Sequence, residues 1–228
     1  MKHKLPRQIC QQKINKIIFR EIKQQKVEVF RASKKLLAQV RSISESIEKE
    51  GLPPYLVKKK LEKGLGYGIF LHPSAKPIAK GQVIAPYAGK VSLDSQNFSD
   101  NDSDYIFSIV SNIILTKEEQ QLFDPKRRYH PRRLYSLDLD AEKVGNFTRF
   151  INHSQKPNIE AHFVQIGRKP EFLPEIVYVA SKTIRPGEQL QVCYEGEDKS
   201  YWGALNIKPT PITPQTYKID KSLRLLNN

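Results

Sequence analysis

The sequence has few cysteines and no long apolar run, and both absences limit what the protein can be. Only two cysteines occur among 228 residues, Cys10 and Cys193, and they form no Cys-x-x-Cys pair. This argues against a disulfide framework and a structural zinc site. No run of about 18 apolar residues exists, so no membrane-spanning helix is expected. The basic N-terminus lacks the apolar segment of a secretory signal. An intracellular, reducing location is therefore predicted.

Several common catalytic patterns are also missing. The five histidines show no His-Glu-x-x-His grouping, which disfavours a metal-dependent hydrolase, and no metal site is predicted. The glycine-rich stretch Gly64-Leu-Gly-Tyr-Gly68 is not followed by Gly-Lys-Ser/Thr and lacks the strand before it and the helix after it that a dinucleotide site needs. Taken alone, this stretch is more typical of a plain β-turn than of a ligand-binding loop.

The charge is uneven along the chain. The net charge is +14, and residues 1–63 hold 17 Lys and Arg against 6 Asp and Glu, whereas residues 64–228 hold 21 against 18. Attraction to nucleic acid or another polyanion is therefore expected mainly in this basic leader. A second cluster, Lys126-Arg-Arg-Tyr-His-Pro-Arg-Arg133, fits a nuclear-import signal or a DNA-phosphate contact, or simply a solvated loop.

The apolar pattern predicts helices first and strands afterwards. Between about Asn15 and Glu50 apolar residues recur every three or four positions, which indicates one or two amphipathic helices ending at Gly51-Leu-Pro-Pro54. After Gly64 short apolar runs predict a mostly β domain, interrupted by a helix from Thr116 to about Phe123 with Glu119 in a capping box. The predicted strands are 68–71, 82–87, 105–110, 113–115, 134–139, 159–164, 176–180 and 189–194.

The stretch from Asn146 to Asn158 is the most informative part of the sequence. It contains the polar pair Asn152-His153 in an apolar strand context, where both side chains need hydrogen-bond partners. A bound ligand would supply them, although local backbone is a common alternative. Further on, Pro186-Gly-Glu-Gln-Leu190 makes a turn into a strand that ends at Tyr194. Taken alone, a tyrosine at a strand end is usually half-buried packing.

Together these motifs resemble the SET-domain protein lysine methyltransferases. The series runs from Gly66-Tyr-Gly68 through Tyr87-Ala-Gly89, Tyr105-Ile-Phe107, Asp140-Ala141, Arg149-Phe-Ile-Asn-His-Ser154 and Pro157-Asn158 to Tyr194, in the order of that family. The resemblance covers residues 64 to about 203, and it is most similar to small bacterial SET proteins of chlamydial type, which include a secreted nuclear effector. It implies a β-clip fold of several small sheets with a knot-like C-terminal segment.

The domain boundaries follow from the charge and the resemblance. Residues 1–63 are predicted to be a basic helical extension, residues 64–203 the SET catalytic domain, and residues 204–228 a tail that helps to close the site. Because Gln155 stands where the family usually has cysteine and no cysteine cluster follows Trp202, a zinc-bound cap is not expected. The tail, the leader or a second subunit of a homodimer would then close the lysine channel.

The resemblance implies transfer of a methyl group from S-adenosyl-L-methionine to a lysine of a basic protein, such as a histone or a histone-like protein. Tyr194 is expected at the transfer point, and Tyr87 is expected to line the lysine channel. The expected cofactor-binding residues are Gly66, Tyr67, Gly68, Tyr105, Arg149, Asn152, His153 and Trp202. Val192 stands where many members place a Phe or Tyr that limits methylation, so the number of methyl groups added is not predicted.

A different function remains open from the sequence. The basic leader also fits a SET-fold protein that binds nucleic acid or chromatin without catalysis. The presence of both Asn152-His153 and Tyr194 argues for activity, because an inactive site has little reason to keep both. The expected location is the bacterial cytoplasm, or a host nucleus for a secreted effector.

Overall fold

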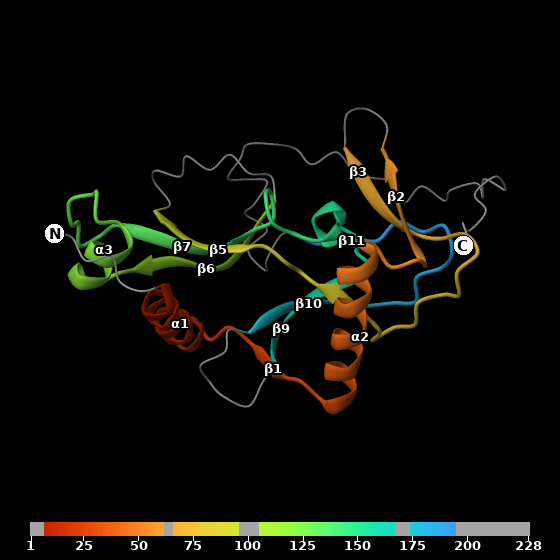
Figure 1. The fold of residues 1–228 in the computed structure, drawn as a ribbon, viewed down its shortest axis with the longest axis horizontal. Helices are drawn as coiled ribbons and strands as arrows, with labels where there is room; N and C mark the ends of the chain where they lie inside the picture. Colours follow the sequence, from red (N-terminus) through yellow and green to blue (C-terminus); the bar gives the residue numbers. More distant parts are fainter. Residues whose placement is uncertain (1–6, 62–65, 96–104, 167–173, 195–228) are drawn as a thin grey trace. The chain divides into compact units, whose positions relative to one another are not determined.

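The fold is described from a computed structural model (Figure 1), for residues 7–61, 66–95, 105–166 and 174–194. Contacts between residues group the chain into two compact units. Unit 1 comprises residues 1–31, 88–145 and 163–175, and unit 2 comprises residues 32–87, 146–162 and 176–228. The basic leader contributes to both units. The predicted tail, 204–228, lies outside the described residues, and the predicted domain boundaries stay a prediction.

Unit 1 is built on a three-stranded antiparallel sheet covered by a helix. The strands β5 (Lys90–Ser95), β7 (Leu134–Asp140) and β6 (Ile106–Ile114) lie in the order β5-β7-β6. Helix α1 (Arg7–Gln24) contributes Ile17, Ile18 and Ile22 to a core that also contains side chains of β6 and β7. Strand β1 (Val29–Arg31) follows and pairs in parallel with residues 163–165 of strand β9 (Ile159–Gln165).

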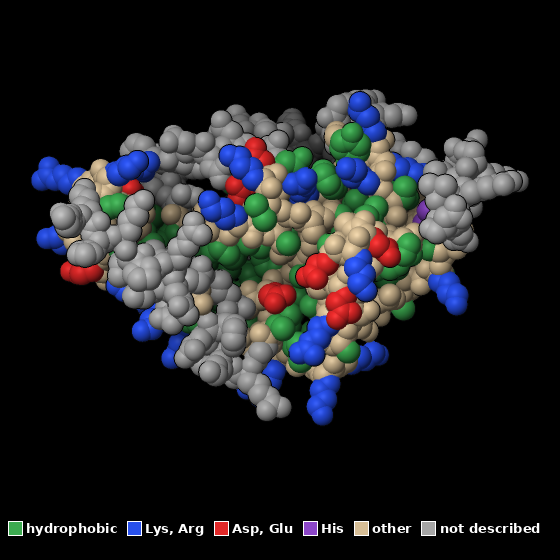
Figure 2. All heavy atoms as spheres, in the orientation of Figure 1, with side chains coloured by type: hydrophobic (Ala, Val, Ile, Leu, Met, Phe, Trp, Pro, Cys, Tyr) green, Lys and Arg blue, Asp and Glu red, His purple; other side chains and the backbone are tan. Residues whose placement is uncertain are grey.

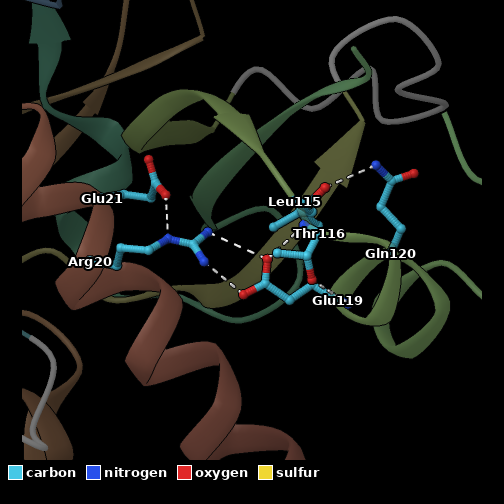
Figure 3. Close-up of polar contacts among 6 residues, drawn as sticks. All are labelled: Arg20, Glu21, Leu115, Thr116, Glu119 and Gln120. Carbon is cyan, nitrogen blue, oxygen red and sulfur yellow. Dashed lines mark hydrogen bonds and ion pairs between the residues drawn. The ribbon is translucent and has the colours of Figure 1, made fainter. Parts of the chain in front are cut away.

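Helix α3 (Lys117–Phe123) starts where the capping box predicts it. The Thr116 side chain accepts a hydrogen bond from the Glu119 amide (3.2 Å), and the Glu119 carboxylate accepts one from the Thr116 amide (2.9 Å). The same carboxylate pairs with Arg20 of α1 at 2.8 Å (Figure 3). One side chain therefore both starts α3 and joins it to α1, because its two oxygens accept from the backbone and from a guanidinium.

Unit 2 contains a hairpin and most of a larger sheet. The hairpin pairs β2 (Leu56–Lys60) with β3 (Tyr67–Leu71) in antiparallel fashion. The sheet runs in the order β4-β10-β9-β11-β8. Its strands are β4 (Val83–Pro86), β8 (Asn152–His153), β9 (Ile159–Gln165), β10 (Glu175–Ala180) and β11 (Gln191–Val192). Helix α2 (Lys34–Glu50) begins at the N-cap Ser33, ends at Gly51 and contacts β4 through Gln39, whose side chain accepts from the Val83 amide.

The C-terminal segment lies between two strands that precede it by many residues. Strand β11 pairs in parallel with β8 on one side and with β9 on the other, with Val192 opposite both His153 and Ile159. The buried Asn158 clasps it there: its amide nitrogen donates to the Gln189 carbonyl (2.9 Å), and its oxygen accepts from the Gln191 amide (2.8 Å). The Asn158 side chain thus adds two hydrogen bonds to the strand pairing that holds this segment.

The predicted fold class is confirmed, with differences at several elements. The helical region divides into α1 and α2, and the predicted strands 105–110 and 113–115 form the single irregular strand β6, in which Asn112 has a positive φ of 58°. The predicted strand 189–194 is regular only at β11, because Asn158 takes over part of the backbone pairing. Strands β1, β2 and β5 were not predicted. Among the described helices, none is long and apolar enough to cross a membrane.

We expect Asn158→Ala to destabilise the protein by about 3 kcal/mol, because it removes two buried hydrogen bonds and leaves the Gln189 carbonyl and the Gln191 amide without their partner. Urea unfolding with both variants and wild type measures this. Gln121→Ala, which truncates an exposed amide on α3, is the control and is expected to change the free energy of unfolding by less than about 0.5 kcal/mol. A loss for Asn158→Ala no larger than the control's would show that the clasp is not required.

Candidate functional site

The short 3₁₀ helix Phe147–Phe150 leads the chain into the candidate site in unit 2. Its N-cap is Asn146, whose side-chain oxygen accepts from the Thr148 amide (3.0 Å) and whose nitrogen donates to the Pro86 carbonyl (2.8 Å). These bonds fix the helix to the end of β4. The residues that follow, Ile151 to His153, therefore enter β8 in a defined orientation.

Asn152 joins this segment to the glycine-rich stretch. Its side-chain nitrogen donates to the Tyr67 carbonyl at 2.9 Å. Gly66 has a φ of +70°, a conformation that favours glycine. A Cβ on Gly68 would lie 2.5 Å from Nε2 of Gln189 and 3.3 Å from Nδ2 of Asn152. The two side-chain amides thus approach the Gly68 backbone as closely as they do because no side chain stands there.

His153 and Tyr194 lie against each other. The Tyr194 amide donates to Nδ1 of His153 at 3.0 Å, and the two ring centroids are 5.5 Å apart. Because Nδ1 accepts, a neutral His153 ring carries its proton on Nε2. The Tyr194 hydroxyl donates to the Ile151 carbonyl at 2.7 Å. Two hydrogen bonds therefore hold Tyr194 at both its backbone and its hydroxyl.

A buried tyrosine that was not predicted as a site residue lies beside the predicted ones. Tyr178 of β10 is 2% exposed, and its ring centroid is 5.7 Å from that of Tyr87. Burial raises the pKa of Tyr178 well above its usual range, and the neighbouring Tyr194 and Tyr87 raise it further. Its phenol is therefore neutral at physiological pH. In the sequence Tyr178 is one residue of an ordinary apolar run, which gave no signal.

Cations surround the aromatic side of the site. Nζ of Lys58 lies 4.7 Å from the ring centroid of Tyr67 and 4.6 Å from that of Phe150, and these two rings meet edge to face at 6.0 Å. The Arg149 guanidinium lies 4.9 Å from the Phe150 centroid. Lys58 also was not predicted, because it stands in the basic leader outside the motif series. Both positive groups therefore lie against the Phe150 ring, and Lys58 also lies against the Tyr67 ring.

Gln189 is the third side chain that the sequence reasoning missed. It is 5% exposed, and its Nε2 has no hydrogen-bond partner among the described residues. An amide donor buried in this way costs about 1–3 kcal/mol until an acceptor reaches it. In the sequence Gln189 is the variable position of Gly187-Glu-x-Leu190, so its place over Gly68 could not be read from the motif.

The structure therefore places most predicted site residues in one unit. Unit 2 contains the following predicted residues: Gly66, Tyr67, Gly68, Tyr87, Arg149, Asn152, His153 and Tyr194. Tyr105 lies in unit 1, where its carbonyl accepts from the Ala141 amide at 3.0 Å. Trp202 lies outside the described residues. Asn152 finds a hydrogen-bond acceptor within the chain, so its amide nitrogen does not need a ligand. The roles of all these residues stay predictions.

No metal centre accompanies the site in the part of the chain that is described. No group of three or more His, Cys, Asp and Glu side chains lies close enough together there to hold a metal ion. Cys193, next to Tyr194, is exposed. The site offers hydrogen-bonding backbone at two glycines, side-chain amides, an imidazole and four tyrosines. Such groups can bind and orient a ligand.

Comparison with known proteins identifies the region that carries these residues. A family model described as the SET domain matches residues 66–195. Among curated proteins, histone-lysine N-methyltransferase SUV39H1 of Xenopus laevis is 30% identical over 125 residues, which are 52% of this chain and 27% of that protein. The chain therefore spans about a quarter of the length of this relative. The narrower resemblance to small bacterial SET proteins stays a prediction.

Two solved structures are similar as well. ATXR5, solved with histone H3.1 mono-methylated on R26, has a TM-score of 0.51 and 18% identity. The match covers 74% of this chain and 68% of the ATXR5 chain. SUVH6 of Arabidopsis thaliana, solved with SAM, has a TM-score of 0.44 and 27% identity. The match covers 64% of this chain and 27% of the SUVH6 chain. The likeness to ATXR5 supports the fold alone.

We expect Gly68→Ala to lower the free energy of unfolding by about 1–3 kcal/mol, because the new methyl group displaces the buried amide of Gln189. The double variant Gly68→Ala with Gln189→Ala is expected to recover part of that loss, since the shortened side chain makes room. Chemical denaturation of wild type, both single variants and the double variant gives the coupling energy. Additive effects of the two substitutions would contradict the close approach of Gln189 to Gly68.

Proposed function

Because the chain belongs to the SET-domain family, we propose that it is a protein lysine methyltransferase that uses S-adenosylmethionine. Its substrate would be a lysine of a basic protein such as a histone or a histone-like protein. The name of the Xenopus laevis relative, a histone-lysine N-methyltransferase, supports this substrate class. The observation that carries the proposal is the double fixation of Tyr194, by the Ile151 carbonyl and by His153, beside the Gly66–Gly68 stretch.

The residues fit a cofactor of this type. The buried Nε2 of Gln189 has no hydrogen-bond partner among the described residues, so it is a donor that an acceptor group of the cofactor would satisfy, and it lies against the Gly68 backbone. Gly66, Tyr67, Gly68, Arg149, Asn152 and His153 would hold S-adenosylmethionine, with Tyr105 and Trp202 as further predicted contacts. When bound, the cofactor supplies a methyl group on a sulfonium, whose thioether is a good leaving group.

The chain's own residues must prepare the lysine amine. A lysine with a pKa of about 10.4 is protonated at neutral pH, so the site has to favour the uncharged amine. Tyr87 and Tyr178 provide a buried aromatic surface, and the neutral phenol of Tyr178 offers no negative charge that would stabilise an ammonium. Burial against these rings would lower the pKa of the amine.

Tyr194 then orients the amine. Its hydroxyl proton is already donated to the Ile151 carbonyl, so the oxygen presents its lone pairs to the amine hydrogens. An acceptor in this position would aim the nitrogen lone pair toward the methyl carbon. It would orient the amine without acting as a general base. Holding the reacting atoms in line supplies a large part of the rate in such transfers.

A second candidate function is a SET-fold protein that binds nucleic acid or chromatin without catalysis. The net charge of +14 favours it. The retention of Asn152, His153 and Tyr194 in one unit favours catalysis instead. The proposal also includes a homodimer in which the second subunit closes the lysine channel. The proposed location is intracellular, either a bacterial cytoplasm or a host nucleus.

The deciding experiment incubates the protein with methyl-labelled S-adenosylmethionine and, in separate reactions, histones and bacterial nucleoid proteins. We expect label on lysine of at least one of these basic proteins, located by mass spectrometry. Label on the enzyme itself would identify its own lysines as substrates. Cofactor binding with no labelled protein in any reaction would overturn the proposal in favour of the binding function.

We expect Tyr194→Phe to lower turnover by at least about tenfold with little change in cofactor affinity, because it removes the oriented hydroxyl and keeps the ring. Turnover of the methyl transfer and calorimetric binding of S-adenosylmethionine are the two measurements. An unchanged turnover would remove Tyr194 from the transfer point.

We expect the opposite pattern for Asn152→Ala. This substitution removes the bond to the Tyr67 carbonyl that positions the glycine-rich stretch, so cofactor affinity should fall by about tenfold or more. Calorimetry measures it, and circular dichroism checks that the variant folds. A folded variant with wild-type cofactor affinity would contradict the predicted role of Asn152.

A further inference from the structure

The loop that follows α3 concentrates arginine on the surface of unit 1. Residues 124–133 contain five Lys and Arg against one Asp, and four of the five cations are Arg. Lys126, Arg128 and Arg132 are exposed and have no ion pair with any described residue. Arg127 pairs with Asp124 at 3.5 Å, which uses the one acidic group of the loop. Most of the positive charge of the loop therefore faces water without a counter-ion from the described chain.

A buried glutamine holds this loop in place. Gln120 of α3 is 2% exposed; its Nε2 donates to the His130 carbonyl (2.9 Å) and to the Leu115 carbonyl (3.2 Å), and its Oε1 accepts from the His130 amide (3.1 Å). The Arg132 amide in turn donates to Nδ1 of His130 at 3.3 Å. The backbone that presents the arginines is thus fixed at its middle, which lowers the entropy that binding would have to remove.

A row of cations on α1 extends the same surface. Lys13, Lys16, Arg20 and Lys23 recur at spacings of three and four, so they share one side of the helix. Arg20 bonds to Glu119 of α3 at 2.8 Å and to its neighbour Glu21 at 2.8 Å (Figure 3). The three lysines are exposed. The ion pair with Glu119 brings the lysine row next to the helix that leads into the arginine loop.

Acidic residues do not balance these cations. Residues 7–31 and 116–133 together hold 13 Lys and Arg against 5 Asp and Glu, and two of the five, Glu21 and Glu119, are already bound to Arg20. Figure 2 shows Lys and Arg side chains along the edge where α1 and α3 lie in Figure 1. We refer to Lys13, Lys16, Lys23, Lys126, Arg128 and Arg132 as the α1–α3 surface.

We propose that the α1–α3 surface binds the phosphodiester backbone of double-stranded DNA. Arginine forks match phosphate oxygens with two hydrogen bonds, and cations without an ion pair among the described residues, on two helices joined by the Arg20–Glu119 pair, suit a stiff polyanion. Tyr129, between Arg128 and His130, is 38% exposed and offers a flat ring to a sugar or a base. Contacts of this kind carry no base-sequence information, so the binding is independent of DNA sequence.

This surface shares no residue with the candidate methyltransferase site: its residues belong to unit 1, and the site residues belong to unit 2 except for Tyr105. The proposal does not rest on catalysis and holds for either of the two candidate functions. For an active enzyme, DNA binding would raise the local concentration of basic proteins that coat DNA.

The test measures binding of the full chain to a fluorescently labelled DNA duplex by anisotropy over a range of salt concentrations. The test variant Lys126→Gln/Arg128→Gln/Arg132→Gln removes three charges from the loop. The matched control Lys34→Gln/Lys35→Gln/Arg41→Gln removes three exposed charges from α2 in unit 2. Both sets are exposed side chains, so both variants are expected to fold, and their net charges are equal.

We expect the loop variant to bind at least about tenfold more weakly and to lower the slope of log K against log salt by about two to three, since each phosphate contact contributes about 0.9 to that slope. The control should bind within about twofold of wild type. Equal losses in both variants would overturn the proposal, because they would show an effect of net charge alone. The proposal would also be overturned if the protein did not bind DNA at low salt, or if polyglutamate at matched charge competed for the protein as strongly as unlabelled DNA.

A further variant, Gln120→Met, tests whether the fixed loop matters. It keeps every cation and most of the side-chain volume but removes the three hydrogen bonds to Leu115 and His130. We expect DNA affinity to fall by about threefold or more, with folding confirmed by circular dichroism. A folded Gln120→Met protein with wild-type DNA affinity would show that the positioning by Gln120 is not needed.

Discussion

The clasp of Asn158 on the segment 189–191 is the contact on which the rest of unit 2 depends. It is a buried side chain with both ends of its amide engaged by backbone of a segment about 30 residues further along the chain. Because both bonds are buried, each is worth more than a surface contact and neither can be replaced by water without cost. Together with the strand pairing of β11, the clasp fixes the segment that places Gln189 against Gly68 and Tyr194 against His153.

The candidate site is accordingly an outcome of strand pairing more than of loop shape. In the parallel pairing of β8 with β11, Asn152 lies opposite Gln191, and His153 lies opposite Val192. Each of the two polar residues then turns its side chain to a different neighbour: Asn152 to the Tyr67 carbonyl and His153 to the Tyr194 amide. The same two residues that would contact a cofactor also hold the glycine-rich stretch and the tyrosine together. Asn152 and His153 would therefore serve both cofactor binding and the internal structure of the site.

Local rules predicted the elements whose signals are local. The capping box at Thr116 and Glu119, the helix stop at Gly51 and the apolar runs of β3, β7, β9 and β10 depend on neighbouring residues, and all are found. Strand β2 was not predicted because its three lysines indicate a solvated part of the basic leader. In the structure it pairs with β3, where Leu56 lies opposite Leu71 and Val57 lies opposite Phe70. The motif order predicted a set of site residues, most of which the structure places in unit 2, and their roles stay predictions. It could not reveal Tyr178, Lys58 or Gln189, because their places follow from tertiary pairing alone.

The parallel insertion of β11 between β8 and β9 has a consequence for the order in which the chain can fold. Its partners are distant: Tyr194 and His153 are 41 positions apart, and neither neighbouring strand can pair with β11 before the intervening chain has looped back. Hairpins such as β2 with β3 need no such closure and can form early. We therefore expect the closing of this long loop to be a late event, so that the arrangement that would recognise a cofactor forms only near the end of folding. Partly folded forms of the protein would then not bind the cofactor, and bound cofactor would slow the unfolding of the fully folded molecule.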